Sequence, residues 1–229
     1  MTKKVSVVIT AAGSSSRMKG SVSKIFLNID EKTVIEWTIN SFLEISDINE
    51  LIVVTKEEYF EKIGTFLKNV PFNTKLVVGG NSREESTFNG LMAVSSETDY
   101  VICHDGARPL LSKEIILNVI NELDKYDAVI TGVKAKDTMK IVSDSMEVVS
   151  TPDRRNLYNI QTPQAFKKDL ILKAYQKFFN ENFFVTDDSS VVSNLNIPVK
   201  LIEGEYSNIK ITTNEDIDLV REIVKRGVY

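Results

Sequence analysis

The alternation of apolar runs with amphipathic stretches constrains the fold of this chain more than any other feature of its sequence. The apolar runs are short, rich in Val and Ile and nearly unbroken, as expected of strands covered on both faces. They lie at Val5–Thr10, Leu51–Thr55, Lys75–Val78, Tyr100–His104 and Asp127–Val133. Stretches with helical periodicity separate them, at Val34–Ile45, Glu57–Asn69, Arg83–Ser95 and Lys113–Tyr126. This order predicts an α/β fold, a mostly parallel Rossmann-like sheet flanked by helices.

The pattern changes after Val133. Two short strand-like runs, Met139–Val142 and Met146–Ser150, are joined by Ser143-Asp144-Ser145, which is typical of a hairpin. We therefore expect one domain over residues 1–229 with a projecting β-arm inserted at about 134–160. Beyond the arm we expect helices at Lys168–Phe178, Asp187–Asn194 and Asn214–Lys225, and strands at Val199–Glu203 and Asn208–Thr212.

Composition and charge exclude several classes of protein. The formal net charge of −4 argues against binding a nucleic-acid polymer, which requires a basic surface. The sequence contains no run of about 18 apolar residues, so it predicts no membrane span. The first apolar run ends in Gly13-Ser14-Ser15-Ser16-Arg17 rather than in a signal-peptidase site, so we expect a cytoplasmic protein. A single Cys103 and a single His104 exclude an internal disulfide and a Cys- or His-rich metal cluster.

Ligands of parallel sheets bind beyond the carboxyl ends of the strands, which directs attention to three loops. In the first, Ala11–Lys24, small residues let backbone N–H groups approach an anion closely. Arg17 adds a planar fork for phosphate oxygens, and Lys24 adds a point charge. The alternative is a solvated, serine-rich turn with two surface cations. The loop lacks the spacing of a P-loop or of a dinucleotide-binding turn.

The second loop, Gly79–Ser86, pairs two glycines with hydrogen-bonding side chains. Gly80 permits close backbone approach, and Asn81 and Ser86 can hydrogen-bond the edge of a base. The alternative is an ordinary strand-to-helix turn capped by Ser82.

The third loop, His104–Leu111, places an acid directly after a buried strand. The Asp105 carboxylate could hold Mg²⁺ near phosphates, with Arg108 close by. The alternative is an Asp–Arg pair that only orders the loop. We expect His104 to be structural and Cys103 to be a small buried hydrophobe.

Further polar groups lie on the arm and in the C-terminal region. Thr138 and Arg154 fall within charged segments of the arm, for which the alternative is a solvated face. Thr186 precedes two aspartates. Lys210 alternates with Ile209 and Ile211, so it should point away from the core side of its strand, where it could be any solvent-facing lysine.

Taken together and in order, these segments resemble the 2-C-methyl-D-erythritol 4-phosphate cytidylyltransferase family from Val7 to about Asp218. The matching stretches are A-A-G-S-S-S-R-M with Lys24, G-G-N-S-R-E-E-S, H-D-G-A-R-P, K-D-T-M-K, T-P-D-R, Q-T-P-Q-A-F, V-T-D-D-S-S and E-G-E-Y-S-N-I-K-I-T. The resemblance implies a nucleotide-diphospho-sugar-transferase-like fold. It also implies transfer of CMP from CTP to methylerythritol phosphate, with release of pyrophosphate and with Mg²⁺ as cofactor.

The resemblance also assigns roles to individual residues. It places Ala11, Ala12, Gly13, Arg17 and Lys24 in the loop that binds the CTP phosphates, and Gly80, Asn81 and Ser86 on the cytidine. It places Asp105 and Lys210 on nucleotide and metal, and Arg108, Thr138, Arg154 and Thr186 at the methylerythritol phosphate site. Arg17, Lys24 and Lys210 are then the catalytic cations. The family's arm mediates a homodimer, so Thr138 and Arg154 could act on the partner's site.

Some positions depart from the family pattern, and two rival functions follow. Ser15 replaces a frequent glycine, Ser23 and Ile25 flank Lys24 where Pro and Gln are common, and Asn81 stands where Asp is frequent. Ribitol-5-phosphate cytidylyltransferases share several of the motifs, although Lys136-Asp137-Thr138, the H-D-G-A-R-P wording and Ser86 favour methylerythritol phosphate. A non-catalytic nucleotide-binding regulator is the second rival, and retention of Arg17, Lys24 and Asp105 argues against it.

Overall fold

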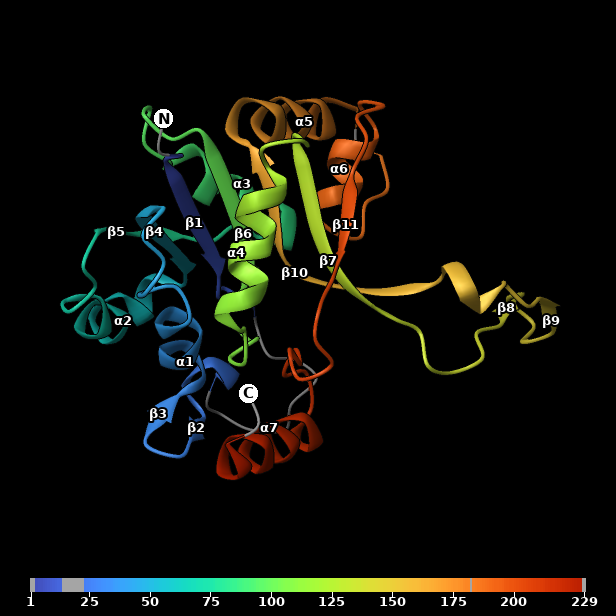
Figure 1. Cartoon of the computed structure of the whole chain (residues 1–229), viewed down its shortest axis with the longest axis horizontal. Coiled ribbons are helices and arrows are strands. Elements are labelled where there is room, and N and C mark those ends of the chain that lie inside the picture. The colour runs from blue at the N-terminus through green and yellow to red at the C-terminus, as the bar shows by residue number, and fades with distance from the viewer. Residues whose placement is uncertain (1–2, 14–22, 182, 228–229) are drawn as a thin grey trace.

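The computed structural model describes residues 3–13, 23–181 and 183–227 of the 229-residue chain. A seven-stranded sheet in the order β11-β7-β10-β6-β1-β4-β5 forms its centre (Figure 1). The strands are β1 (Val5–Thr10), β4 (Ile48–Thr55), β5 (Asn73–Val78), β6 (Tyr100–Asp105), β7 (Ala128–Lys134), β10 (Tyr158–Lys167) and β11 (Lys200–Glu203). Only β10 runs antiparallel to its neighbours within this sheet. The predicted fold class is therefore confirmed.

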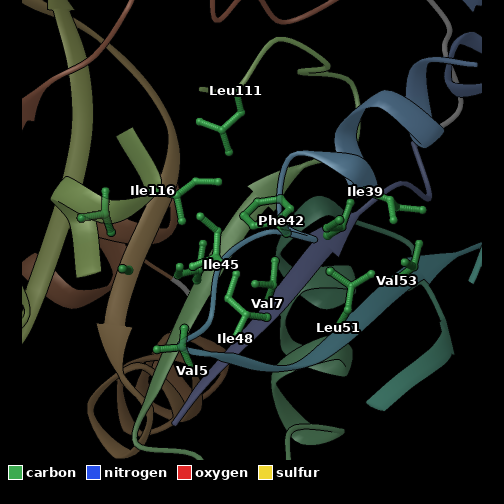
Figure 2. Close-up of a cluster of buried hydrophobic side chains, with 14 of the residues drawn as sticks. Val5, Val7, Ile39, Phe42, Ile45, Ile48, Leu51, Val53, Leu111 and Ile116 are labelled. Carbon is green, nitrogen blue, oxygen red and sulfur yellow. The ribbon is translucent and has the colours of Figure 1, made fainter. Parts of the chain in front are cut away.

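Helices cover both faces of the sheet. Buried side chains of α1 (Val34–Asn40), α2 (Phe60–Leu67) and α4 (Lys113–Glu122) pack on one face. Those of α3 (Arg83–Met92), α5 (Lys168–Glu181) and α6 (Asp188–Ser193) pack on the other. Side chains alternate along a strand, so Val7 belongs to the first cluster and Val8 to the second. Figure 2 shows the first cluster, in which Val7 and Leu51 of the sheet meet Ile39 and Phe42.

Helices α1 to α4 end earlier than the apolar pattern predicts. The first expected helix reaches Ile45, but α1 ends at Asn40, and the non-helical segment that follows carries the buried Phe42 and Ile45. The second begins as a short 3₁₀ helix, η2 (Glu57–Tyr59), before α2. Ser82 and Ser112 accept hydrogen bonds from the third residues of α3 and α4, as expected of helix caps. Burial thus continues past the points where helical hydrogen bonding stops.

Two strand assignments differ from expectation. Strand β10 was not expected, because polar Gln161 and Gln164 and the cis Thr162–Pro163 bond interrupt its apolar pattern. The pairing of β10 with β7 is irregular between Gln161 and Gln164, so the proline avoids the regular ladder. The strand expected at Asn208–Thr212 is wrong. That segment joins no sheet ladder and is tied to the body through bonds such as Ile211 N–H to Ala107 O.

An arm projects from the edge of the domain between β7 and β10 (Figure 1). Its root is the pairing of Lys134 with Tyr158, and its hairpin consists of β8 (Ile141–Val142) and β9 (Val148–Ser150). A short 3₁₀ helix, η3 (Arg154–Asn156), lies between β9 and β10, where the chain returns from the hairpin to the sheet. The hairpin was predicted from the sequence, although both strands are shorter than expected.

A third apolar cluster lies beyond the carboxyl ends of the strands and packs together β2 (Asn28–Ile29), α7 (Asn214–Arg226) and the segment around Ile211. Helix α7 contributes Ile217 and Val220, and these pack with Ile211 and with Ile29 of β2, which pairs with β3 (Lys32–Thr33). The short 3₁₀ helix η1 (Lys24–Phe26) precedes β2. The cluster thereby secures the segment that carries Lys210. No helix in the described ranges is long and apolar enough to cross a membrane.

Candidate active site

A cleft of about 510 Å³ opens at the carboxyl ends of β1 and β6. Residues of the first loop and of the Gly79–Ser86 loop line it. Nine residues expected at a nucleotide site line this cleft: Ala11, Ala12, Gly13, Lys24, Gly80, Asn81, Ser86, Asp105 and Lys210. Arg17, the remaining expected cation of the first loop, lies outside the described residues. The cleft therefore gathers segments from both ends of the chain at the edge of the sheet where ligands bind.

Close backbone approach explains the paired glycines. A Cβ atom at Gly79 would lie 2.3 Å from the Cβ of Ala12, which no real pair of atoms tolerates. The Gly80 N–H donates to the Ser86 hydroxyl (3.0 Å), and that hydroxyl donates to Ser82 O (2.8 Å). Ser86 thus fixes the loop from within, whereas Asn81 is exposed at the rim. The expected turn with its Ser82 cap is present and forms a wall of the cleft.

Asp105 is the buried acid of the site. Its Oδ2 accepts from Lys210 Nζ (3.0 Å) and from Arg108 Nε (3.1 Å). Burial would raise the pKa of this carboxyl, but the neighbouring cations, Lys210 first, then Arg108 and Arg83, hold it well below its usual range. The Asp–Arg pair considered from the sequence is present, and Lys210 joins it.

The two catalytic lysine candidates lie on adjoining segments. Lys24 Nζ donates to Ile211 O (2.8 Å), so the end of the first loop contacts the residue next to Lys210. Lys210 was expected on a strand. It lies instead on an irregular segment, and its ammonium group reaches Asp105 in the cleft. Two cations separated by most of the chain are therefore brought to one cavity.

His104 and Cys103 have structural surroundings. The His104 ring contacts Arg108 O through Nε2 (3.2 Å) and the Thr162 hydroxyl through Nδ1 (3.0 Å). Burial is the main cause that lowers the pKa of His104 to about 4, so the ring is neutral at pH 7. Burial also raises the pKa of the Cys103 thiol, which packs in the core. Both side chains lie where the sequence predicts.

A smaller pocket of about 230 Å³ adjoins the cleft. Arg108 and Thr186, expected at the acceptor site, line this pocket rather than the cleft. Arg83, Asp105 and Lys210 line both cavities. The two cavities therefore meet at one buried carboxylate with cations around it.

Sequence reasoning did not name six lining residues of the smaller pocket as site residues, namely Arg83, Ile160, Gln161, Thr162, Gln164 and Asp187. Arg83 was noted only as part of a loop, and Gln161 and Gln164 only as part of a motif. Gln164 accepts from Ser189 N–H and donates to Asp187, which fixes the segment that carries Thr186. The available signal was the polar Q-T-P-Q stretch within an otherwise apolar region.

Thr138 and Arg154 belong to the arm, which projects from the domain (Figure 1), and neither residue lines the cleft or the smaller pocket. Both side chains are exposed, and Arg154 Nη1 donates to Lys136 O (2.8 Å) across the root of the arm. A single chain does not bring these residues to the cleft. The expectation that they act on a partner's site stays a prediction.

Comparisons with known proteins agree with this architecture. The family model described as 2-C-methyl-D-erythritol 4-phosphate cytidylyltransferase matches residues 5–226. A relative of that name from Caldanaerobacter subterraneus subsp. tengcongensis is 46% identical, over 97% of this chain and 99% of the relative. Another of the same name, from Clostridium botulinum (strain Okra / Type B1), is 41% identical over 97% of this chain and 98% of its own length. The solved 4-diphosphocytidyl-2C-methyl-D-erythritol synthase of Anaerococcus prevotii superposes with a TM-score of 0.90 at 41% identity, covering 99% of this chain and 100% of that one.

Proposed function

Because the chain belongs to the 2-C-methyl-D-erythritol 4-phosphate cytidylyltransferase family, we propose that it transfers CMP from CTP to 2-C-methyl-D-erythritol 4-phosphate and releases pyrophosphate. One observation carries the proposal. Lys24 and Lys210, from opposite ends of the chain, line one cleft with Asp105 at the carboxyl edge of the sheet. A cavity with several cations, walled by close-packed backbone, suits a nucleoside triphosphate.

In the proposed reaction a phosphate oxygen of the acceptor attacks the α-phosphorus of CTP. A bond forms between these two atoms, and the bond from the α-phosphorus to the bridging oxygen breaks. The electron pair of that bond leaves with pyrophosphate. A phosphate monoester is largely dianionic at neutral pH, since its second pKa is about 6. The attack therefore needs no general base, which agrees with a neutral His104 whose two ring nitrogens are both hydrogen-bonded.

The main barrier is repulsion between two anions. Two unit charges 4 Å apart interact by about 4 kcal/mol at an effective dielectric of 20. Lys24 lines the cleft, where its ammonium group is a point charge that can donate to phosphate oxygens. Lys210 contacts Asp105 at the junction of the two cavities. In the proposed reaction, negative charge develops there between CTP and the acceptor phosphate. We assign both lysines, and Arg17 of the first loop, to stabilising the transition state.

Mg²⁺ is the proposed cofactor, and Asp105 is the residue that would hold it. Within the described ranges, no group of three or more His, Cys, Asp or Glu side chains could bind a metal by itself. A single carboxylate fits Mg²⁺, which is usually bound by one or two carboxylates together with substrate phosphates and water. When bound, the ion neutralises charge on the phosphate oxygens.

We assign the acceptor to the smaller pocket and propose that a second copy of the chain completes it. Arg108 and Thr186 lie at this pocket, whereas Thr138 and Arg154 are available only on the arm. The arm also exposes large apolar side chains, which supports an interface. They are Met139, Ile141, Val142, Met146, Val148 and Val149. The cytoplasmic location stays a prediction.

Pyrophosphate release tests the proposal. The chain is mixed with CTP and Mg²⁺, and then with 2-C-methyl-D-erythritol 4-phosphate, with ribitol 5-phosphate or with no acceptor. We expect release only with the first acceptor. Release with ribitol 5-phosphate alone would overturn the acceptor assignment. Binding of CTP without release under any condition would identify a non-catalytic nucleotide-binding protein.

A further inference from the structure

Arg83 occupies an unexplained position at the junction of the two cavities. Among the described residues, three line both the cleft and the smaller pocket, namely Arg83, Asp105 and Lys210. Asp105 and Lys210 already have roles in the proposed chemistry. Arg83 is the first residue of α3 and directly follows the loop that walls the cleft.

A two-point ion pair holds Arg83. Its Nη1 and Nη2 atoms donate to Oδ1 and Oδ2 of Asp188, at 2.9 and 2.8 Å. The hydroxyl of the buried Tyr175, a residue of α5, donates to the same carboxylate. The Asp188 side chain is 2% exposed and that of Arg83 is 30% exposed. Paired, parallel bonds of this kind set a direction as well as a distance.

This ion pair joins the walls of the two cavities. On one side, Arg83 continues from Gly80–Ser82 of the cleft. On the other, Asp188 continues from Thr186 and Asp187 of the smaller pocket. The partners lie 105 residues apart in sequence, so the ion pair is a tertiary contact between the starts of α3 and α6.

The charges argue against Arg83 as a direct phosphate ligand. Burial alone would lower the pKa of Arg83, but the Asp188 carboxylate outweighs this effect and holds the pKa above its ordinary value. The guanidinium is therefore permanently charged, and its partner neutralises it. Removing two charges from water offsets much of the attraction between them, and buried ion pairs often add little to stability. Their better supported use is to specify one geometry.

We propose that Arg83 is a positioning residue, which acts through Asp188 to hold the nucleotide cleft and the acceptor pocket in register for the transfer. The inference rests on the proposed function, because it concerns how two bound substrates are aligned. A displacement of about 1 Å can slow a reaction by about a hundredfold even when both substrates still bind. The signature is therefore a loss in kcat with little change in either KM.

Steady-state kinetics test this role with Arg83→Lys, which keeps the charge but cannot form two parallel bonds, and with Asp188→Asn. We expect kcat to fall about thirtyfold or more in each, with both KM values within about threefold. The double variant should be no slower than the slower single variant, because both changes break one connection. An unchanged kcat, or a loss confined to the KM of one substrate, would overturn the proposal.

Lys75→Gln is the matched control. Lys75 pairs with the buried Glu50 (2.8 Å), and their side chains are 43% and 4% exposed, similar to Arg83 and Asp188. This pair lines neither cavity. We expect its loss to leave kcat within about twofold, well under 1 kcal/mol by rate. A thirtyfold loss in the control would attribute the Arg83 effect to general destabilisation and overturn the proposal.

Hydrogen exchange separates this inference from the proposed activity, because it needs no turnover. Peptides that cover Thr186–Ser193 should exchange about tenfold faster in Arg83→Lys than in wild type, since the only change lies across the ion pair. The Lys75→Gln protein should match wild type there. Equal exchange in all three proteins would overturn the connection even if the enzyme is active. An inactive wild type with faster exchange in Arg83→Lys would overturn the proposed function alone.

Discussion

Two buried carboxylates, one near the amino end of its strand and one at the carboxyl end of its strand, differ in what surrounds them. Glu50 lies near the start of β4 and is 3% exposed, and Asp105 ends β6 and is 7% exposed. Each contacts a lysine, at 2.8 Å for Glu50 and 3.0 Å for Asp105. The pKa of both carboxyl groups lies below its usual range, because partners outweigh the effect of burial. Burial and a low pKa therefore do not distinguish a site from a structural network.

The partners make the distinction. Glu50 accepts from the Ser6 hydroxyl and from Ser95 N–H, so one lysine completes a neutral, closed network. Asp105 instead shares one oxygen between Lys210 and Arg108, and Lys24 lines the same cleft. A surplus of cations around one acid leaves local positive charge, which favours the binding of an anion. The comparison teaches that excess positive charge beside an open cavity identifies the site.

Replacing Lys24 should have the largest effect. Lys24→Ala should lower kcat by about 10³-fold, or about 4 kcal/mol, because it removes a cation from the transition state. The matched change beside the other carboxylate, Lys75→Ala, should leave turnover nearly unchanged. Turnover is measured by pyrophosphate release, and folding by thermal unfolding. Activity of Lys24→Ala within about threefold of wild type would remove Lys24 from the mechanism.

As the pH falls, the protein should lose the stability contributed by the neutral His104 before it loses the stability contributed by Glu50. His104 has a pKa of about 4 when folded and 6.5 as its ordinary value, so the unfolded chain binds the extra proton between these values. The contribution of His104 to the free energy of unfolding is fully present above pH 6.5, and about 3 kcal/mol should be lost as the pH drops to about 4. Glu50 loses its contribution only below its ordinary pKa of 4.5. Urea unfolding at pH 7, 5.5 and 4.5 measures the loss.

The chain has one histidine, so its imidazole NMR signals report His104 without a variant. Between pH 8 and 5 these signals should move by no more than about a tenth of their full titration shift. A midpoint near 6.5 would contradict a buried, neutral ring.

Removing the charge from each acid should separate catalysis from stability. Asp105→Asn should slow turnover about a hundredfold, or about 2.7 kcal/mol, and should also destabilise the protein because buried Arg108 loses its counter-ion. Glu50→Gln should cost about 2 kcal/mol of unfolding free energy and leave kcat unchanged. Kinetics and urea unfolding of both variants provide the comparison. Equal effects on turnover would show that the two carboxylates do not differ in function.

The smallest expected effect concerns the arm. Arg154→Ala should raise the acceptor KM about tenfold, or about 1.4 kcal/mol, with little change in the KM for CTP. Arg155→Ala is the control, because this neighbouring, exposed arginine pairs locally with Asp153. Kinetics with varied acceptor check the prediction. An unchanged acceptor KM and kcat in Arg154→Ala would exclude a role for this residue.

Local pattern predicted most of the fold. The buried parallel strands stand out because both of their faces are apolar, and Ser82 and Ser112 cap helices as expected. Strand β10 was missed because a central strand with a proline and two glutamines carries no apolar pattern. The alternation around Lys210 predicted a strand that the structure does not contain, because Ile209 and Ile211 pack in the third apolar cluster, with α7, rather than on a sheet.

The sequence by itself determined which chemical groups end the strands, since strand ends and loop composition are local properties. It supplied Asp105 after a buried strand and the small residues that allow close backbone approach. Only the tertiary structure decided which distant groups meet. Lys24 reaches Ile211 across 187 residues, and Arg83 reaches Asp188 across 105. Such contacts depend on how the helices and loops pack around the sheet, because no local preference acts over those separations.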